Sequence, residues 1–189
     1  MIVDRTALAA YLDSVVATLR DKGIAFGTGL SDAEIEAIEG RFSFRFPPDL
    51  RLFLQTALPL SPHFPNWRRP SEDALAAQLA WPIEGLCFDI EHNGWWLEVW
   101  GEKPPAPNEA CRVARLRLAE VPRLIPIYGH RYLPTEPHLP GNPVFSVWQS
   151  DIIHYGCDLA GYFTLEFGLP LPDWAAHSPR PIRFWDNFL

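Results

Sequence analysis

The sequence predicts an α+β fold that forms a single domain over residues 1–189. Apolar residues recur at helical spacing through much of the chain before residue 80, and they alternate with polar residues in several later segments. A last helical segment follows the alternating ones. Because helices and strands are grouped instead of alternating strictly along the chain, the pattern favours the α+β class over a doubly wound α/β fold.

The first two expected helices begin with recognisable capping residues. Residues 4–19 carry apolar side chains at three- and four-residue spacing, with Asp4 as the N-cap. In residues 31–42, Ser31 and Glu34 form a capping-box pattern, in which each side chain satisfies a free backbone N–H of the other residue. Both segments are therefore expected to be amphipathic helices.

Two more helices are expected before residue 81. Pro47 and Pro48 suit the first turn of a helix, where a missing backbone N–H costs nothing. Residues 59–70 form a proline-broken loop, after which residues 71–80 are predicted to be a short helix capped by Ser71.

The second half of the chain is expected to supply the sheet. In residues 83–91, apolar and polar positions alternate with period two, which is typical of a strand. Further strands are predicted in residues 123–134 and 142–156, and further helices in residues 108–121 and 158–168. The proline-rich tail, residues 169–189, ends in an apolar segment and is therefore expected to wrap around the body of the protein.

Residues 88–101, FDIEHNGWWLEVWG, are expected to form a β-hairpin. Asn93-Gly94 is typical of a two-residue type I′ turn, because both central positions need a positive φ. The resulting register turns His92 toward the core with the apolar side chains. The opposite face is then acidic and aromatic, and it is the candidate partner-binding surface: Asp89, Glu91, Trp96, Glu98 and Trp100.

In this hairpin Asp89 and Glu98 would face each other in a close cross-strand pair, which is destabilising for like charges. A positive charge is therefore expected nearby. It could be Arg180 or Arg183 of the tail, a basic protein partner, or a divalent metal, although the spacing matches no metal-binding motif. If an internal cation pairs with Asp89, an Asp89→Asn substitution should destabilise the isolated protein.

A second candidate pocket combines two histidines with a carboxylate and other polar groups: His130, Arg131, Tyr132, Asp151, His154 and Tyr155. Such a group could bind zinc or perform acid–base chemistry. However, Asp151 and His154 are three residues apart in an expected strand and should point to opposite faces. No catalytic or metal-binding motif is present, so the sequence assigns no catalytic residue, no metal site and no cofactor.

Composition narrows the classes of function. A net charge of −7 and a pI near 5.3 argue against general nucleic-acid binding and favour a basic partner. The three cysteines lack C-x-x-C spacing and are expected to be reduced. No signal peptide and no apolar run long enough for a membrane helix is visible, so a soluble cytoplasmic protein is expected.

Residues 30–55, LSDAEIEAIEGRFSFRFPPDLRLFLQ, resemble the signature of the SUKH superfamily (Smi-one/Knr-four-like). DLAGYFTLEF, residues 158–167, is similar to the C-terminal helix of that family. The resemblance spans residues 25–168 in element order, and it makes the helix of residues 1–24 and the tail look like additions. An inserted ALPLSPHFPNWRR stands where family members usually have an Asn-Gly turn.

The resemblance implies helices packed on a largely antiparallel sheet, and binding rather than catalysis. Bacterial members commonly act as immunity proteins that neutralise toxins, whereas eukaryotic members resemble scaffolds. The first hypothesis is therefore a non-enzymatic protein-binding module, such as an immunity protein against a basic toxin. The alternatives are a metal-assisted hydrolase that uses the His130/His154 region, and a regulatory scaffold of the same fold.

Overall fold

The computed structural model describes residues 4–68 and 72–188, and it confirms the α+β class. The helices are α1 (Arg5–Asp21), α2 (Asp32–Phe42), α3 (Pro48–Thr56), α4 (Glu72–His92), α5 (Pro107–Leu118) and α6 (Leu159–Phe167), with two 3-10 helices, η1 (Glu98–Trp100) and η2 (Trp185–Phe188). The strands are β1 (Phe26–Thr28), β2 (Ala57–Pro59), β3 (Leu124–Tyr128), β4 (Arg131–Pro134), β5 (Val144–Trp148) and β6 (Asp151–Gly156).

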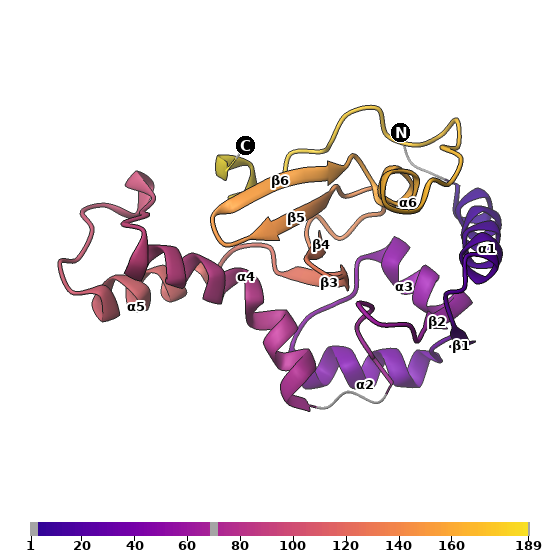
Figure 1. Cartoon of the computed structure of the whole chain (residues 1–189), viewed down its shortest axis with the longest axis horizontal. Coiled ribbons are helices and arrows are strands. Elements are labelled where there is room, and N and C mark those ends of the chain that lie inside the picture. Colours follow the sequence, from indigo (N-terminus) through magenta and orange to yellow (C-terminus); the bar gives the residue numbers. More distant parts are fainter. Residues whose placement is uncertain (1–3, 69–71, 189) are drawn as a thin grey trace.

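The strands form two antiparallel sheets (Figure 1). β1 pairs with β2, and β3 to β6 form a four-stranded meander in sequence order. In this meander Phe145 pairs with His154, and Trp148 pairs with Asp151 at the β5–β6 turn. Facing partners share one face of a sheet, so these two pairs point to opposite sides.

Each face of the meander supports its own hydrophobic core. One core joins a sheet face to α1, α3 and α6, with buried side chains that include Leu12, Leu50, Ile125, Leu133 and Phe163. The other joins the opposite face to α4, α5 and the tail, with buried side chains that include Leu86, Phe145, Val147, Ile152 and Trp185. In Figure 1, α4 leads away from the sheet, and its C-terminal half forms an arm with η1 and α5.

The predicted N-terminal caps are confirmed for the helices whose caps are described. The Asp4 carboxylate accepts from the Thr6 N–H at 3.3 Å at the start of α1. At α2, the Ser31 hydroxyl accepts from the Glu34 N–H at 3.2 Å, and the Ser31 N–H donates to Glu34 at 2.8 Å. Pro48 opens α3 as expected, whereas the predicted cap Ser71 lies outside the described residues.

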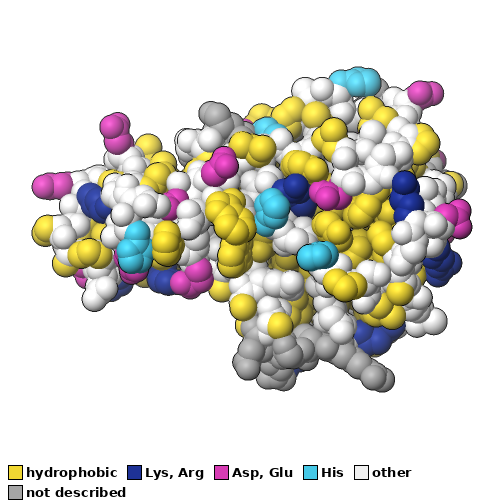
Figure 2. Space-filling view, in the orientation of Figure 1, with side chains coloured by type: hydrophobic (Ala, Val, Ile, Leu, Met, Phe, Trp, Pro, Cys, Tyr) yellow, Lys and Arg dark blue, Asp and Glu magenta, His cyan; other side chains and the backbone are white. Residues whose placement is uncertain are grey.

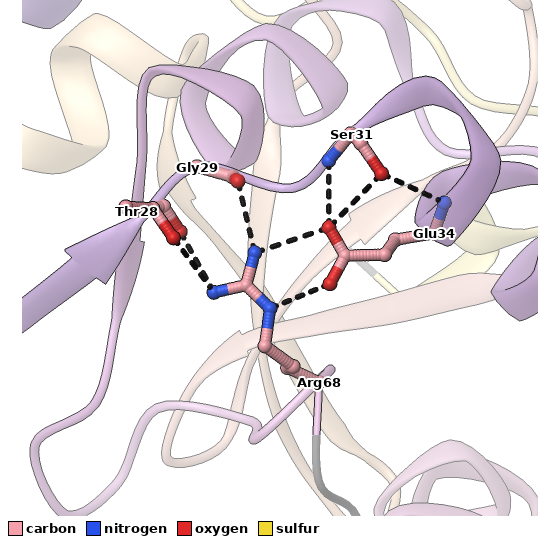
Figure 3. Close-up of polar contacts among 5 residues, drawn as sticks. All are labelled: Thr28, Gly29, Ser31, Glu34 and Arg68. Atoms are coloured by element: carbon pink, nitrogen blue, oxygen red, sulfur yellow. Dashed lines mark hydrogen bonds and ion pairs between the residues drawn. The ribbon is translucent and has the colours of Figure 1, made fainter.

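Arg68 joins β1 to the start of α2, and its loop position gave no sign of this role in the sequence (Figure 3). Its Nε and Nη2 donate to the two carboxylate oxygens of Glu34 at 2.6 and 3.1 Å. It also donates to the carbonyls of Thr28 and Gly29, both at 2.9 Å, and to the Thr28 hydroxyl at 3.3 Å. The Arg68 guanidinium, followed by the Ser31 N–H, lowers the pKa of Glu34 to about 2.

The strand predicted at residues 83–91 is wrong, because α4 continues through Pro82 to His92. Proline lacks the N–H that would bond to the carbonyl four residues earlier, which belongs to Gln78. The hydroxyl of Tyr132 on β4 donates to that carbonyl at 2.9 Å instead. The helix therefore passes the proline with its free acceptor satisfied by the sheet.

The predicted hairpin at residues 88–101 is also wrong. Asn93 and Gly94 end α4, with Gly94 at φ +70° in the left-handed conformation that commonly follows a helix. The N–H groups of Asn93 and Trp95 both donate to the Asp89 carbonyl, at 2.9 and 3.1 Å. Asn-Gly fits both a type I′ turn and a helix end, and here it serves the second purpose.

The tail wraps around the body as expected. Ile182 and Trp185 are buried in the core shared with α4 and α5. The Trp185 indole N–H donates to the carbonyl of Pro122 at 2.7 Å, so the polar edge of this ring is satisfied where it is buried. No helix in residues 4–68 and 72–188 is long and apolar enough to cross a bilayer.

Candidate functional site

Asp89 is a buried anchor for the β5–β6 turn, not part of an exposed acidic face. One carboxylate oxygen accepts from the N–H and the hydroxyl of Ser150, at 2.8 and 2.5 Å. The other accepts from the Asn93 side chain at 2.5 Å. Burial raises the pKa of Asp89, but the bonds from Ser150 and Asn93 outweigh burial and hold the pKa below its ordinary value.

The same turn sits directly on α4 at Gly85. A Cβ atom at Gly85 would lie 2.9 Å from the Cα of Gln149, closer than side-chain carbons normally approach. Gln149 itself adopts a positive φ of 57°, which the tight turn requires. Gly85 and Asp89 therefore fix the end of the β5–β6 hairpin on the helix.

Exposed apolar side chains surround this junction, and we call four of them the aromatic ridge: Trp81, Phe88, Trp148 and Ile153. Trp81 and Phe88 are seven residues apart on one stripe of α4. The rings of Trp81 and Trp148 lie 5.7 Å apart. Exposed fractions in the ridge run from 41% for Trp81 to 54% for Trp148. On the side of the molecule that Figure 2 draws, hydrophobic and histidine side chains lie side by side near the middle.

An arginine-centred network continues from the ridge along the same sheet face. The ring of His130 lies 6.0 Å from that of Trp148. Arg131 contacts the His130 ring nitrogen, donates to Ser146 at 2.7 Å and pairs with Glu166 at 3.2 Å. Burial, followed by the Arg131 charge, lowers the pKa of His130.

Arg131 also stacks on Tyr155, with its guanidinium carbon 3.7 Å from the ring centre. Three of the six residues of the second candidate pocket are therefore brought together: His130, Arg131 and Tyr155. Ser146 and Glu166 complete the network, and sequence reasoning missed both. Ser146 faces Arg131 across the β4–β5 ladder, a pairing that only a correct strand register would have revealed.

The other three residues of that pocket lie elsewhere. Tyr132 is buried under α4, and His154 stacks on Phe145 with 5.1 Å between ring centres. Asp151 is exposed beside Trp148, so Asp151 and His154 face opposite sides of the sheet as expected. Within the described residues, no group of three or more His, Cys, Asp or Glu side chains could hold a metal ion.

The acidic and aromatic face predicted for residues 87–100 does not form, because it depended on the hairpin. Trp100 is buried against Trp95 and Trp96, with ring centres 5.6 and 5.1 Å away. The Trp96 indole N–H donates to the Gly101 carbonyl at 2.8 Å. These rings belong to the core that includes the tail, where Trp95 and Trp100 stack on Phe188 and Phe184.

The acidic members of that face are also dispersed. Glu98 is exposed on η1, whereas Asp89 is buried on α4. Glu91 accepts a weak bond from the Cys111 thiol at 3.3 Å. His92, expected in the core, is exposed at the end of α4 with its ring 4.5 Å from that of Phe88.

Arg180 and Arg183, the tail arginines expected to supply a positive charge beside Asp89, bind other groups instead. Arg180 donates to the Asn142 side chain at 2.7 Å, and Arg183 donates to the Glu120 carbonyl at 2.6 Å. The donors that stabilise the Asp89 carboxylate are neutral groups, those of Ser150 and Asn93.

The cysteines are free thiols, as expected. Cys87 and Cys111 are buried between α4 and α5. Burial, together with the neighbouring Glu91, raises the pKa of Cys111 to about 12. A thiol with so high a pKa is a poor nucleophile.

Comparisons with family models, curated proteins and solved structures find no match to this chain. The proposed function therefore rests on the geometry of the described residues.

Proposed function

We propose that this protein is a non-enzymatic protein-binding module whose partner docks on the aromatic ridge. The observation that supports this is the exposed contact between Trp81 and Trp148, extended by Phe88 and Ile153. Tryptophan is among the residues that dominate the energy of protein interfaces. Exposed apolar side chains that gather on one surface are typical of interaction sites.

The way in which the ridge is held in place supports the same proposal. Asp89 and Gly85 hold the β5–β6 turn on α4, so Trp81 and Trp148 are presented by two elements fixed to each other. A surface that is already ordered loses little conformational entropy when a partner binds. The ridge is in this respect suited to binding without rearrangement.

Charge favours a basic partner. The chain carries a net charge of −7, which attracts cations at long range. Asp151 stands opposite Trp148, and Glu98 and Glu102 lie on the arm; none of the three forms an ion pair with a described residue. The resemblance to the SUKH superfamily adds a concrete form of the proposal, an immunity protein that sequesters a basic toxin, with a regulatory scaffold as the alternative role for the same surface.

We do not favour a metal-assisted hydrolase. His130 lies beside Trp148, whereas His154 shares the opposite sheet face with Phe145. A mechanism that used both histidines would need them to reach one substrate from opposite sides of the sheet.

The proposal is tested by capture of partners in cells of the organism that carries this gene. A photo-crosslinking amino acid placed at Phe88 marks what touches the ridge, in chains with and without Trp81→Ala and Trp148→Ala. We expect one basic protein to be crosslinked, and the double substitution to reduce its yield at least about tenfold.

The matched control is Leu116→Ala, which removes an equally exposed apolar residue on α5 outside the ridge. This variant should retain the partner. Equal capture by the double variant and the unchanged chain, or capture of no partner at all, would overturn the proposal.

A further inference from the structure

A second candidate binding site lies on a different side of α4 from the aromatic ridge. It is a cleft of about 1010 Å³ between the C-terminal end of α2, α4, the end of α5 and the loop that leads into β3. Its walls are largely apolar, with Leu79, Ile83, Leu118, Val121 and Leu124 among them. Its volume is close to the upper end of the range typical for small-molecule sites, about 300–1,000 Å³.

Arg123 places a positive charge in this apolar cleft. Its Nη1 donates to the carbonyl of Phe42, the last residue of α2, and its guanidinium lies 5.8 Å from the ring centre of Phe44. Among the described residues it pairs with no carboxylate, and the Phe42 carbonyl is the one hydrogen-bond acceptor of its guanidinium. Burial lowers the pKa of Arg123, which reflects how incompletely the charge is solvated.

The backbone of Arg123 is fixed in position. Its N–H donates to the Thr135 hydroxyl at 3.1 Å, and its carbonyl accepts from the Thr135 N–H at 2.8 Å. A charged group that is already held in place needs little reorganisation to bind an anion.

Most of the other charged groups around the cleft already have a hydrogen-bond or ion-pair partner. Arg115 and Glu84 form a two-pronged ion pair at 2.6 and 2.7 Å. Glu39 accepts from the Phe46 N–H at 2.8 Å, and Glu136 lies 4.0 Å from Arg183. Arg45 lines the cleft as well and adds another positive charge to its wall.

We propose that this cleft binds a small amphipathic anion, with its apolar body against α4 and α5 and its anionic head on Arg123. The planar guanidinium fork matches the oxygens of a carboxylate or a phosphate, which it can hold with two parallel hydrogen bonds. The apolar walls bind the body of the ligand by the same burial that stabilises a protein core.

The test uses decanoate and decyl phosphate as anionic probes and 1-decanol as the neutral counterpart, all below micelle-forming concentrations. Titration calorimetry gives the dissociation constants, and NMR amide shifts locate the probe. We expect at least one anion to bind at least about tenfold more tightly than the alcohol, with shifts at Leu79, Ile83 and Leu124. The relative affinity of the two anions distinguishes a carboxylate site from a phosphate site.

Arg123→Gln should weaken binding of the preferred anion at least about tenfold, whereas Arg123→Lys should keep part of it. Arg117→Gln is the matched control, because Arg117 is exposed on α5 and does not line the cleft. Equal affinity of the Arg123→Gln variant and the unchanged protein, equal affinity for decanol and decanoate, or shifts confined to residues outside the cleft would overturn the proposal.

Arg123→Gln removes a bond at the end of α2 and could unfold that helix, which circular dichroism would reveal. Ala76→Trp then decides the question, since it fills the cleft from an exposed wall position and leaves Arg123 intact. Loss of anion binding in this variant supports the site, and retention of binding rules it out.

Discussion

The hydroxyl of Tyr132 donates a 2.9 Å hydrogen bond to the main-chain carbonyl of Gln78. This carbonyl has no donor within α4, because residue 82 is proline. The bond spans 54 positions of sequence and ties the helix to β4 at the point where the helix is weakest. A side chain that the sequence indicated as part of a reactive pocket is therefore a structural support.

We expect Tyr132→Phe to lower the free energy of unfolding by about 1–3 kcal/mol, because a partly buried carbonyl is left without a donor. Urea denaturation measures the change. Tyr128→Phe is a suitable control, since the Tyr128 hydroxyl forms no hydrogen bond with a described residue.

A double-mutant cycle isolates the cause. Pro82→Ala restores an N–H at position 82, which can donate to Gln78 in the ordinary helical manner. In the Pro82→Ala background, Tyr132→Phe should lower the free energy of unfolding clearly less than it does in the unchanged protein. If Tyr132→Phe lowers the free energy of unfolding by the same amount in both backgrounds, the bond to Gln78 is not the source of the stability that the hydroxyl provides.

Asp89→Asn should destabilise the protein by about 1–3 kcal/mol at pH 7, because an amide cannot accept all three hydrogen bonds that the carboxylate accepts. The folded pKa of Asp89 lies below its ordinary value, so this stabilisation is present above about pH 4 and is lost as the pH falls through the folded pKa. Chemical denaturation at pH 7 and in acid measures both effects.

Glu98→Gln is the control for this experiment, since Glu98 is exposed and is not among the partners of the Asp89 carboxylate, and we expect no measurable change. An Asp89→Asn protein as stable as the unchanged one would show that Ser150 and Asn93 do not stabilise the charge.

The helices with strong local signals could be predicted from the sequence. Ser31 and Glu34 are three residues apart and satisfy each other within one turn, so nothing distant is needed to form that cap. Asp158 likewise caps α6 as expected, through the N–H of Gly161 at 2.7 Å. Local hydrogen bonds of this kind can be predicted without knowledge of the fold.

The end of α4 could not be predicted, because its pattern fits two structures. Leu86, Phe88 and Ile90 alternate as in a strand, while Ile83, Leu86 and Ile90 are also spaced as in a helix. Contacts with Tyr132 and Ser150, which are 54 and 61 positions away in sequence, stabilise the helix. The aromatic ridge was missed for the same reason: Trp81 and Trp148 meet only when the β5–β6 turn rests on α4.

Glu34 and Arg68 permit a direct electrostatic test. Arg68→Gln should raise the pKa of Glu34 from about 2 toward its ordinary value, because the guanidinium that stabilises the carboxylate is gone. The stabilisation is present above about pH 4.3 and is lost as the pH falls toward 2, so the variant should differ least from the unchanged protein in strong acid. Carboxyl NMR titration measures the pKa.

The neighbouring pair of Asp32 and Arg51, 2.7 Å apart, serves as the control. Arg51→Gln should raise the pKa of Asp32, which Arg51 lowers, and leave that of Glu34 near 2. A Glu34 pKa that stays near 2 in the Arg68→Gln protein would mean that Ser31 sustains it without the arginine.

His154 should make the protein less stable in mild acid. Its Nε2 is buried without a hydrogen-bond partner among the described residues, and the Asp186 carboxylate is 3.8 Å away. Burial lowers the pKa of His154 more than Asp186 raises it. Below about pH 6.5 the unfolded chain therefore takes up a proton more readily than the folded one, and the free energy of unfolding falls by at most about 1.4 kcal/mol per pH unit.

His154→Phe keeps a ring against Phe145 but cannot be protonated, so it should flatten this fall between pH 7 and pH 5. Part of the slope should remain, because the pKa values of His130 and His138 are lowered as well. Asp186→Asn should steepen the slope by removing the charge that favours the protonated ring. Urea denaturation across this pH range decides the matter: a His154→Phe profile parallel to that of the unchanged protein would show that His154 is not the group that titrates.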